Sequence, residues 1–252
     1  MKKVFIYGVL CCFIFSLIVF TGCTGTQENG VADKPKLVMG TNADFPPFEF
    51  RNEDNEVDGF DVDIAKAIAE ALGRELVIED MEFGGLTQAL NSKRIDMAVA
   101  GITITDKRKE EVNFSDPYHF AGQTVVVRED EEEIKSVDDL EGKIIAVQLG
   151  TTGDLEAHDR FPAENIRQYN KINEAFLDLA NERVDAIIID VPVAERYIEI
   201  KGGCKTVGGV FTEEYFGIAV SKENEELLEE INTVLADLKE SGRFDELISK
   251  WF

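Results

Sequence analysis

Cysteine and histidine, which form disulfides, bind zinc and carry much nucleophilic catalysis, are scarce in this sequence. The 252 residues include four cysteines and two histidines. Cys11 and Cys12 lie in an apolar N-terminal segment and Cys23 directly follows it, so Cys204 stands alone in the remainder, in a stretch that glycines mark as a loop. This distribution excludes a disulfide framework and a cysteine zinc cluster, and we expect neither a metal nor a cofactor.

Basic residues are also few relative to acidic ones. Lys and Arg together number 26 against 50 Asp and Glu, which gives a formal net charge of −24. Because nucleic-acid-binding surfaces are basic, this balance argues against a nucleic-acid partner. The acidic residues are spread along the chain, and their densest run, residues 129–133, is typical of a solvated loop.

Long apolar runs are confined to one segment at the N-terminus. Residues 4–20 carry no charge, follow two lysines and precede Cys23, which comes directly after two small residues. That order suits a lipoprotein signal peptidase, so we predict a signal peptide over residues 1–22 and acylation of Cys23. An uncleaved membrane anchor is the alternative, because the run is close to the minimum spanning length. Either arrangement places the domain outside the cytoplasmic membrane, behind a flexible tether over residues 23–35.

The rest of the chain contains two stretches in which strand and helix patterns alternate. The first begins with the apolar residues 37–40 and the second with residues 143–147. An internal echo supports two units of similar plan: LNSKRID at 90–96 and LANERVD at 179–185 both end a helix, turn tightly and open a strand. Alternating strands and helices predict an α/β fold whose sheets are parallel and carry helices on their faces.

The order of the segments predicts that a second lobe is inserted into the first. Residues 123–127 have the pattern of a strand that leaves the first lobe, and residues 215–220 that of a strand that returns. Apolar stripes at helical spacing over residues 227–238 and 244–251 are typical of core-facing helices. We therefore expect lobe 1 over residues 36–121 and 217–252, and lobe 2 over residues 122–216.

Polar or aromatic loops follow four of the predicted strands. In α/β sheets ligands bind beyond the carboxyl ends of strands, so these loops are candidates for one shared site. They comprise residues 41–45 and 100–103 in the first lobe, and residues 148–152 with Asp190 in the second. For Asp190 the alternative is an N-cap role ahead of a helix that begins near Pro192.

The stretch AGITITDKR, residues 100–108, combines groups that suit one carboxylate. Thr105 is predicted to cap a short helix, which puts Arg108 at its third position, where the guanidinium can reach back over the preceding loop. A backbone N–H at Gly101, the Thr103 hydroxyl and a bidentate guanidinium together fit a carboxylate. The alternative is a surface turn in which Arg108 pairs with a nearby glutamate.

Taken together, these motifs resemble the polar amino-acid-binding branch of the extracellular solute-binding proteins, family 3, which are receptors of ABC importers. The matching stretches are FPPFEF at 45–50, GFDVDIAKAIAEALG at 59–73, AGITITDKRKEEVNFSDPY at 100–118, GTTG at 150–153, and Asp190. The resemblance covers about residues 36–252. It implies a two-lobe periplasmic-binding-protein-like fold of type II, with two hinge strands and with the C-terminal helices packed on the first lobe.

The resemblance also implies a function. It predicts a monomeric receptor that binds one free L-amino acid between its lobes and delivers it to an ABC permease. Arg108 would hold the α-carboxylate, helped by Thr103 and Thr152. Asp190 and the Gly101 carbonyl would take the α-ammonium. A zwitterion needs one fixed cation and one fixed anion, and a closed cleft strengthens both pairs by excluding water.

The same resemblance assigns residues to the side chain of the ligand. Phe45 and Phe83 would sandwich it, with Asn42 and Gln148 nearby. Glutamine receptors carry Lys at the position of Gln148 and His at that of Ile189, whereas Gln148 followed by a Thr-Thr-Gly turn is similar to arginine and lysine receptors. An aromatic pair also suits a guanidinium through cation–π contact. The expected ligand is a basic or polar amino acid such as arginine, lysine or glutamine.

Two other functions are alternatives on the same fold. One is an enzyme similar to cyclohexadienyl dehydratase, and the other is a ligand-sensing module. The sequence has no Ser–His–Asp pattern or phosphate-binding loop, and His119 and His158 are expected to be packing or surface residues, so we predict that the protein is not an enzyme. A sensing module would need a membrane segment after the domain, and the chain as given ends at Phe252 within a predicted helix.

Overall fold

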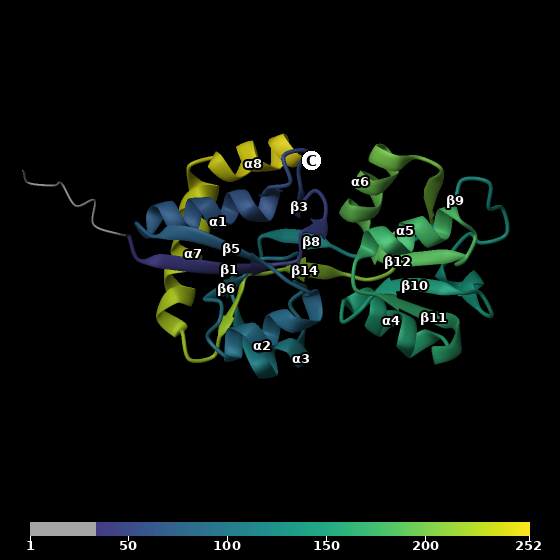
Figure 1. The fold of residues 1–252 in the computed structure, drawn as a ribbon, viewed down its shortest axis with the longest axis horizontal. Coiled ribbons are helices and arrows are strands. Elements are labelled where there is room, and N and C mark those ends of the chain that lie inside the picture. The colour runs from purple at the N-terminus through teal and green to yellow at the C-terminus, as the bar shows by residue number, and fades with distance from the viewer. Residues whose placement is uncertain (1–33) are drawn as a thin grey trace, which may run out of the picture. The chain divides into compact units, whose positions relative to one another are not determined.

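The computed structural model describes residues 34–252, which form two five-stranded sheets with helices on both faces (Figure 1). The predicted signal peptide, the acylation of Cys23 and nearly all of the tether lie outside the described residues. Among residues 34–252, no helix combines the length and the apolar character that crossing a bilayer requires. The predicted α/β class and the presence of two sheets are confirmed.

The first sheet has the strand order β5-β1-β6-β15-β7. Its strands are β1 (Lys36–Thr41), β5 (Glu75–Asp80), β6 (Met97–Ala98), β7 (Val112–Phe114) and β15 (Ala219–Ser221). β1 runs parallel to β5 and β6, whereas β15 runs antiparallel to β6 and β7. A segment from near the end of the chain therefore completes the first sheet.

Helices cover both faces of the first sheet. They are α1 (Phe60–Ala71), α2 (Leu86–Asn91), α3 (Asp106–Glu111), α7 (Glu225–Glu240) and α8 (Arg243–Trp251). In Figure 1, α1 and α8 lie on one side of the sheet, and α2 and α3 lie on the other. In α1 the apolar side chains of Ile64, Ala65 and Ile68 recur at helical spacing and are fully buried.

The second sheet has the strand order β11-β10-β12-β9-β13. Its strands are β9 (Gln123–Arg128), β10 (Ile145–Gln148), β11 (Ile166–Tyr169), β12 (Ala186–Asp190) and β13 (Cys204–Val207). Its helices are α4 (Thr152–Arg160), α5 (Ile172–Ala180) and α6 (Val191–Lys201). α5 and α6 lie on one side of this sheet and α4 on the other (Figure 1).

The prediction of parallel sheets is correct only in part, because both sheets are mixed. β9 runs antiparallel to β12 and β13, as β15 does to its neighbours in the first sheet. A parallel neighbour requires a helical crossover, which gives the alternating pattern. β9 and β15 instead follow directly after the connections between the lobes, and no helix precedes them. The sequence pattern therefore does not indicate that they run antiparallel to their neighbours.

The strands that connect the two lobes are β8 (His119–Ala121) and β14 (Glu214–Phe216), which form an antiparallel pair. Figure 1 shows them between the two sheets. The expectation that residues 123–127 form the outgoing hinge strand is wrong, since this segment is β9 inside the second sheet. Its valines are fully buried there, which explains an apolar pattern without a hinge role. The returning segment 215–220 is divided between β14 and β15.

Smaller elements complete the chain. A three-stranded sheet consists of β2 (Asp44–Phe45), β3 (Glu49–Arg51) and β4 (Val57–Asp58), and pairs Phe45 with Glu49. Short 3₁₀ helices are η1 (Phe83–Gly85), η2 (Val137–Leu140) and η3 (Ala163–Asn165). Cys204 is buried at the start of β13 rather than in a loop, because the turn is made by the two preceding glycines at φ of 65° and 74°.

The two similar stretches, residues 90–96 and 179–185, form the same type of turn with equivalent hydrogen bonds. Lys93 and Glu182 occupy equivalent places at φ of 60° and 57°. Three residues further on, the Asp96 carboxylate accepts the Val38 N–H at 2.7 Å, and the Asp185 carboxylate accepts the Ile144 N–H at 2.7 Å. In each lobe an aspartate thereby ties the turn before one strand to the neighbouring segment.

Replacing Asp185 by alanine is expected to lower the free energy of unfolding by about 1–3 kcal/mol, because the Ile144 N–H loses a charged acceptor. Urea unfolding followed by circular dichroism measures the change. Asp159→Ala, at an exposed position of α4, is the matched control and should be nearly neutral. Equal midpoints for the two variants would contradict a structural role for this aspartate.

Candidate functional site

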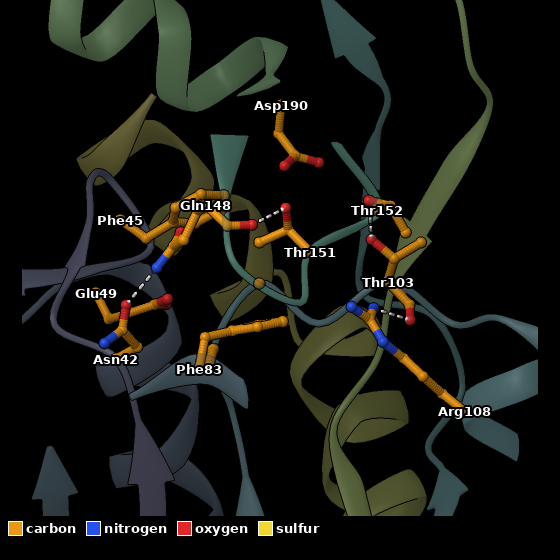
Figure 2. Close-up of a pocket in the computed structure, with 12 residues that line it drawn as sticks. Asn42, Phe45, Glu49, Phe83, Thr103, Arg108, Gln148, Thr151, Thr152 and Asp190 are labelled. Atoms are coloured by element: carbon orange, nitrogen blue, oxygen red, sulfur yellow. Dashed lines mark hydrogen bonds between the residues drawn. The ribbon is translucent and has the colours of Figure 1, made fainter. Parts of the chain in front are cut away.

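A single pocket collects the loops at the carboxyl ends of strands from both sheets (Figure 2). Its lining residues are Asn42, Phe45, Glu49, Phe83, Ala100, Gly101, Thr103, Arg108, Gln148, Thr151, Thr152 and Asp190. The structure thus brings together all nine side chains or backbone positions that the sequence nominated for ligand binding. Glu49, Ala100 and Thr151 are additional.

Arg108 lies at one end of the pocket, held by carbonyl groups from both lobes. The Thr105 hydroxyl accepts the Arg108 N–H at 3.2 Å, so the predicted N-cap and the third helical position are confirmed. The guanidinium donates to the Thr103 carbonyl at 2.7 Å and to the Gly150 carbonyl at 3.1 Å, and lies 5.3 Å from the centre of the Phe83 ring. No carboxylate of residues 34–252 forms an ion pair with it, so the surface-pair alternative is wrong.

Backbone N–H groups beside Arg108 complete an anion-binding arrangement. Thr151 caps α4 by accepting the Asp154 N–H at 3.2 Å, and Thr152 is the first residue of that helix. The first N–H groups of a helix have no partner within it and carry partial positive charge. The guanidinium and the start of α4 therefore both offer donors to an anion at this end of the pocket.

The Gly101 N–H is already bonded within the first lobe. The Gly101 N–H donates to the Asp61 carboxylate at 2.8 Å, away from any ligand, so the predicted use of this N–H for a carboxylate is wrong. The sequence offered no sign of it, because Asp61 lies 40 residues earlier. Gly101 has φ of +53°, and a Cβ there would lie 2.9 Å from the Phe45 ring. Glycine is needed for both reasons.

Asp190 ends β12 and presents a carboxylate that lacks a full set of partners. It occupies the N-cap position of α6, but its side chain makes no capping hydrogen bond, so the capping alternative does not explain it. Its side chain is buried, and its Oδ1 atom has no hydrogen-bond partner among residues 34–252. Burial, reinforced by the negative charge of Glu214, raises the pKa of Asp190 to about 8. The arrangement suits a cationic ligand group at this point.

Glu49 is a second buried carboxylate in the pocket wall, and the sequence reasoning missed it. It is fully buried, and neither of its oxygens has a hydrogen-bond partner in the described part of the chain. Burial and the charge of neighbouring Asp61 raise the pKa of Glu49 well above its usual range. The sequence offered no signal for it, because strand alternation places an acid between two phenylalanines on the face opposite to theirs and so predicts an exposed side chain.

Glu49 and Arg108 lie at opposite ends of the pocket (Figure 2). Asn42 lies beside Glu49, and its Oδ1 accepts from Gln148 Nε2 at 2.8 Å, so the two lobes are bonded at this end as well. Phe45 and Phe83 supply apolar ring surface to the wall. The pocket therefore has an anion-binding end, a carboxylate at the far end, and aromatic surface between them.

Further contacts join the lobes around the pocket. Asn170 donates to the Glu82 carboxylate at 2.9 Å, and the Asn173 N–H donates to Asp44 at 3.0 Å. The Tyr197 hydroxyl donates to the Asp44 carbonyl at 3.2 Å. These bonds, together with those of Arg108 and Gln148, hold the lobes against each other. Within residues 34–252, no group of three or more His, Cys, Asp or Glu side chains is arranged to hold a metal ion.

Comparison with known proteins gives matches along the whole described chain. The family described as bacterial extracellular solute-binding proteins, family 3, matches residues 37–252. The arginine-binding extracellular protein ArtP of Bacillus subtilis is 34% identical over 256 residues, covering 100% of this chain and 98% of ArtP. The structure of holo ArgBP from T. maritima aligns with a TM-score of 0.79 and 47% identity, covering 86% of this chain and 96% of that one.

An ancestral arginine-binding protein has been solved bound to arginine and bound to glutamine. The arginine complex aligns with a TM-score of 0.83 and 43% identity, covering 87% of this chain and 99% of that one. The glutamine complex aligns with a TM-score of 0.84 and 43% identity, covering 87% of this chain and 98% of that one. Likeness of this extent concerns the fold and the family, and the ligand of this chain has to be argued from its own pocket.

Proposed function

Because the chain belongs to the bacterial extracellular solute-binding proteins, family 3, we propose that it captures a cationic L-amino acid, with L-arginine as the foremost candidate, and delivers it to the permease of an ABC importer. The observation that carries the choice of ligand is the pair of buried carboxylates, Glu49 and Asp190, in a pocket whose wall holds one cationic side chain, Arg108.

Charge balance supports a ligand with a net positive charge. A neutral zwitterion can satisfy Arg108 with its carboxylate and Asp190 with its ammonium, but it leaves Glu49 without a cation. A buried charge without a partner is strongly unfavourable, so Glu49 either stays protonated or receives a positive group. The side chain of arginine provides that group, and the aromatic rings of Phe45 and Phe83 suit its planar cation.

The proposed placement follows the donors and acceptors of the pocket. The α-carboxylate lies against Arg108 and the N–H groups of Thr103 and Thr152. The α-ammonium lies between Asp190 and the Gly101 carbonyl. The guanidinium extends past the rings towards Glu49, where Asn42 and Gln148 offer amide oxygens. Every charge of the ligand then meets an opposite charge inside a cavity from which the closed lobes exclude water.

Binding rather than catalysis is the activity of this family, and the relatives named above are binding proteins. ArtP is an arginine-binding extracellular protein, which favours arginine over other cationic amino acids for this chain as well. Glutamine is the second candidate, because an ancestral relative is solved with it. The dehydratase-like and sensing alternatives have no supporting observation in the pocket.

The lobes are proposed to open and close about β8 and β14. Residues 36–121 with 217–252 form one body and residues 122–216 the other. The ligand bridges them, since Arg108 comes from the first and Asp190 from the second. A ligand favours the closed state only through contacts made there, so closure depends on the second-lobe residues. We further propose a monomer held on the outer face of the membrane through an acylated Cys23.

Titration calorimetry of the purified domain with L-arginine, L-lysine and L-glutamine tests the proposal. Arginine is expected to bind with a dissociation constant in the micromolar range or below, which corresponds to a binding free energy of about −8 kcal/mol or a more negative value. Lysine and glutamine are expected to bind more weakly. Binding of glutamine alone would contradict the cationic assignment, and binding of no amino acid would contradict the proposed function.

Glu49→Gln is expected to weaken arginine binding by at least about tenfold, because a charged hydrogen bond to the guanidinium is lost. Glutamine affinity should change less than about threefold, since its amide needs no negative partner. Glu53→Gln, an exposed acid in the turn that follows β3, is the matched control. Equal losses for arginine and glutamine would show that Glu49 does not recognise the ligand's charge.

Arginine affinity is also expected to rise with pH up to about 8. Asp190 has a pKa of about 8 in the closed ligand-free pocket, and a bound ammonium lowers it, so binding releases a proton. Below the free-state pKa, one released proton changes affinity by up to about tenfold per pH unit. Calorimetry in two buffers of different ionisation enthalpy at neutral pH counts the protons. A flat affinity from pH 6 to 8 would contradict the linkage.

A further inference from the structure

Glu214 lies immediately behind the pocket wall, on a strand that connects the lobes. It is the first residue of β14, is buried, and pairs with Ala121 of β8. Its Oε2 atom accepts the Thr103 hydroxyl at 2.7 Å and the Thr152 hydroxyl at 2.7 Å. One oxygen on a connecting strand thus binds two pocket residues, one from each lobe.

Hydrogen-bond accounting fixes the direction of both hydroxyls. A threonine hydroxyl has one hydrogen and two lone pairs, and an ionised carboxylate only accepts. Each hydroxyl donates its one hydrogen to Glu214. The two hydroxyl oxygens lie 3.4 Å apart, but neither has a hydrogen left to donate to the other. Gln123 Nε2 donates to the Thr152 hydroxyl at 3.2 Å, which agrees with that hydroxyl acting as an acceptor.

The remaining oxygen of Glu214 is also engaged, which holds the side chain in place. Its Oε1 atom accepts the Thr212 hydroxyl at 2.9 Å, and Thr212 in turn accepts the Gln123 N–H at 2.7 Å. No cation forms an ion pair with Glu214 among the residues described. Its carboxylate interacts instead at longer range, unfavourably with the carboxylate of Asp190 and favourably with the guanidinium of Arg108.

We propose that Glu214 is a positioning residue, which orients the hydroxyls of Thr103 and Thr152 so that both oxygens accept hydrogen bonds from the α-ammonium of the ligand. Both hydroxyls are oriented in this way only in the closed state, in which residues of both lobes contact Glu214. The proposal rests on the proposed function. A ligand group that meets these two hydroxyl oxygens has to be a donor. The carboxylate of the ligand binds Arg108 and the backbone N–H groups instead. The pocket thereby distinguishes the ammonium end of the amino acid from its carboxylate end.

The bonds of Glu214 also link this recognition to closure. The Ile102–Ile104 segment is bonded to β14, since the Ile104 N–H donates to the Tyr215 carbonyl at 2.8 Å. Thr103 therefore stays with Glu214, whereas Thr152 belongs to α4 of the second lobe. Separation of the lobes breaks the Thr152 bond, frees its hydroxyl to rotate and removes one acceptor from the ammonium site.

The test compares Glu214→Gln with Glu213→Gln, using L-arginine and its deaminated analogue 5-guanidinopentanoic acid. Glu213 is the adjacent exposed acid, so its variant removes the same charge without reaching the threonines. Glutamine replaces one carboxylate oxygen with an NH2 group, so it cannot accept from Thr103, Thr152 and Thr212 together, and its uncharged oxygen accepts more weakly than a carboxylate. Glu214→Gln is expected to weaken L-arginine binding at least about tenfold while changing binding of the analogue less than about threefold. Glu213→Gln should change neither.

An equal loss of affinity for both compounds would overturn the proposal, because Glu214 would then stabilise the pocket without contributing to recognition of the ammonium. No loss for either compound would overturn it as well. Should Glu214→Gln fail to fold in a thermal melt, Thr152→Val replaces it, since this variant removes one of the two hydroxyls and keeps the charge and the backbone N–H. Thr152→Val carries the same expectation. Absence of any arginine binding by the wild type would contradict the proposed function instead.

Discussion

Arg108→Ala is expected to weaken L-arginine binding by at least about a hundredfold, one of the two largest losses among the variants proposed for this protein. Among residues 34–252, the guanidinium is the only cationic side chain in the pocket wall, and two carbonyl groups at 2.7 and 3.1 Å orient it. Without it, the α-carboxylate of a bound amino acid is left in a closed cavity with only neutral N–H groups. Titration calorimetry gives the change directly.

Arg108→Lys separates charge from shape. Lysine keeps the positive charge but cannot donate to both carbonyls and to a carboxylate in one plane, so we expect an intermediate loss of at least about tenfold. Lys107→Ala, an exposed basic residue one position earlier in α3, is the matched control and should leave affinity unchanged. Affinity of Arg108→Ala within about threefold of the wild type, with a normal thermal melt, would contradict the carboxylate assignment.

Asp190→Asn is expected to produce a loss of similar size, at least about a hundredfold, through the opposite end of the amino-acid backbone. The carboxylate is buried, its Oδ1 atom is unpartnered among residues 34–252, and it faces the cavity from the end of β12. An asparagine keeps the shape but offers no negative charge to the α-ammonium. The variant should also remove the rise of affinity with pH.

The stability of Asp190→Asn should change in the opposite direction to its affinity. In the ligand-free protein Asp190 is a buried acid near the charge of Glu214, so replacing it with a neutral group is expected to leave the melting temperature unchanged or to raise it. Glu195→Gln, an exposed acid in α6, is the matched control for both measurements. A destabilised variant with near-normal affinity would assign Asp190 to the fold rather than to the ligand.

Much of the pocket could be predicted from local patterns because the signals are short in range. The Thr105 cap and the third helical position of Arg108 depend on four consecutive residues, and both were correct. Asp190 follows three buried isoleucines, and the position of a strand end predicted where its side chain would lie. Loops at strand ends converge in an α/β sheet, and the predicted loops hold seven of the nine nominated positions. Arg108 followed from its helix cap, and Phe83 from the family resemblance.

Other features escaped prediction because they depend on partners far away in the chain. The Gly101 N–H is bound by Asp61, 40 residues earlier, and this distant partner makes the N–H unavailable to a ligand. The acidic residue of FPPFEF received no role, since strand alternation between two phenylalanines indicates an exposed side chain, whereas the structure buries it in the pocket wall. The hinge was placed on residues 123–127, because a buried strand and a connecting strand have the same apolar pattern.

The amino-acid sequence by itself determined the class of fold, the two units of similar plan, the helix cap before Arg108 and the chemical types of the pocket residues, because these depend on periodicity and on hydrogen bonds within a few positions. The tertiary structure decided that Glu49 faces the cavity and that one oxygen of Glu214 meets hydroxyls 111 and 62 positions away. Such contacts between distant residues arise from the packing of two separate lobes around a pair of connecting strands. The charge and the hydrogen-bond direction that a ligand encounters are properties of that packing, and no local pattern encodes them.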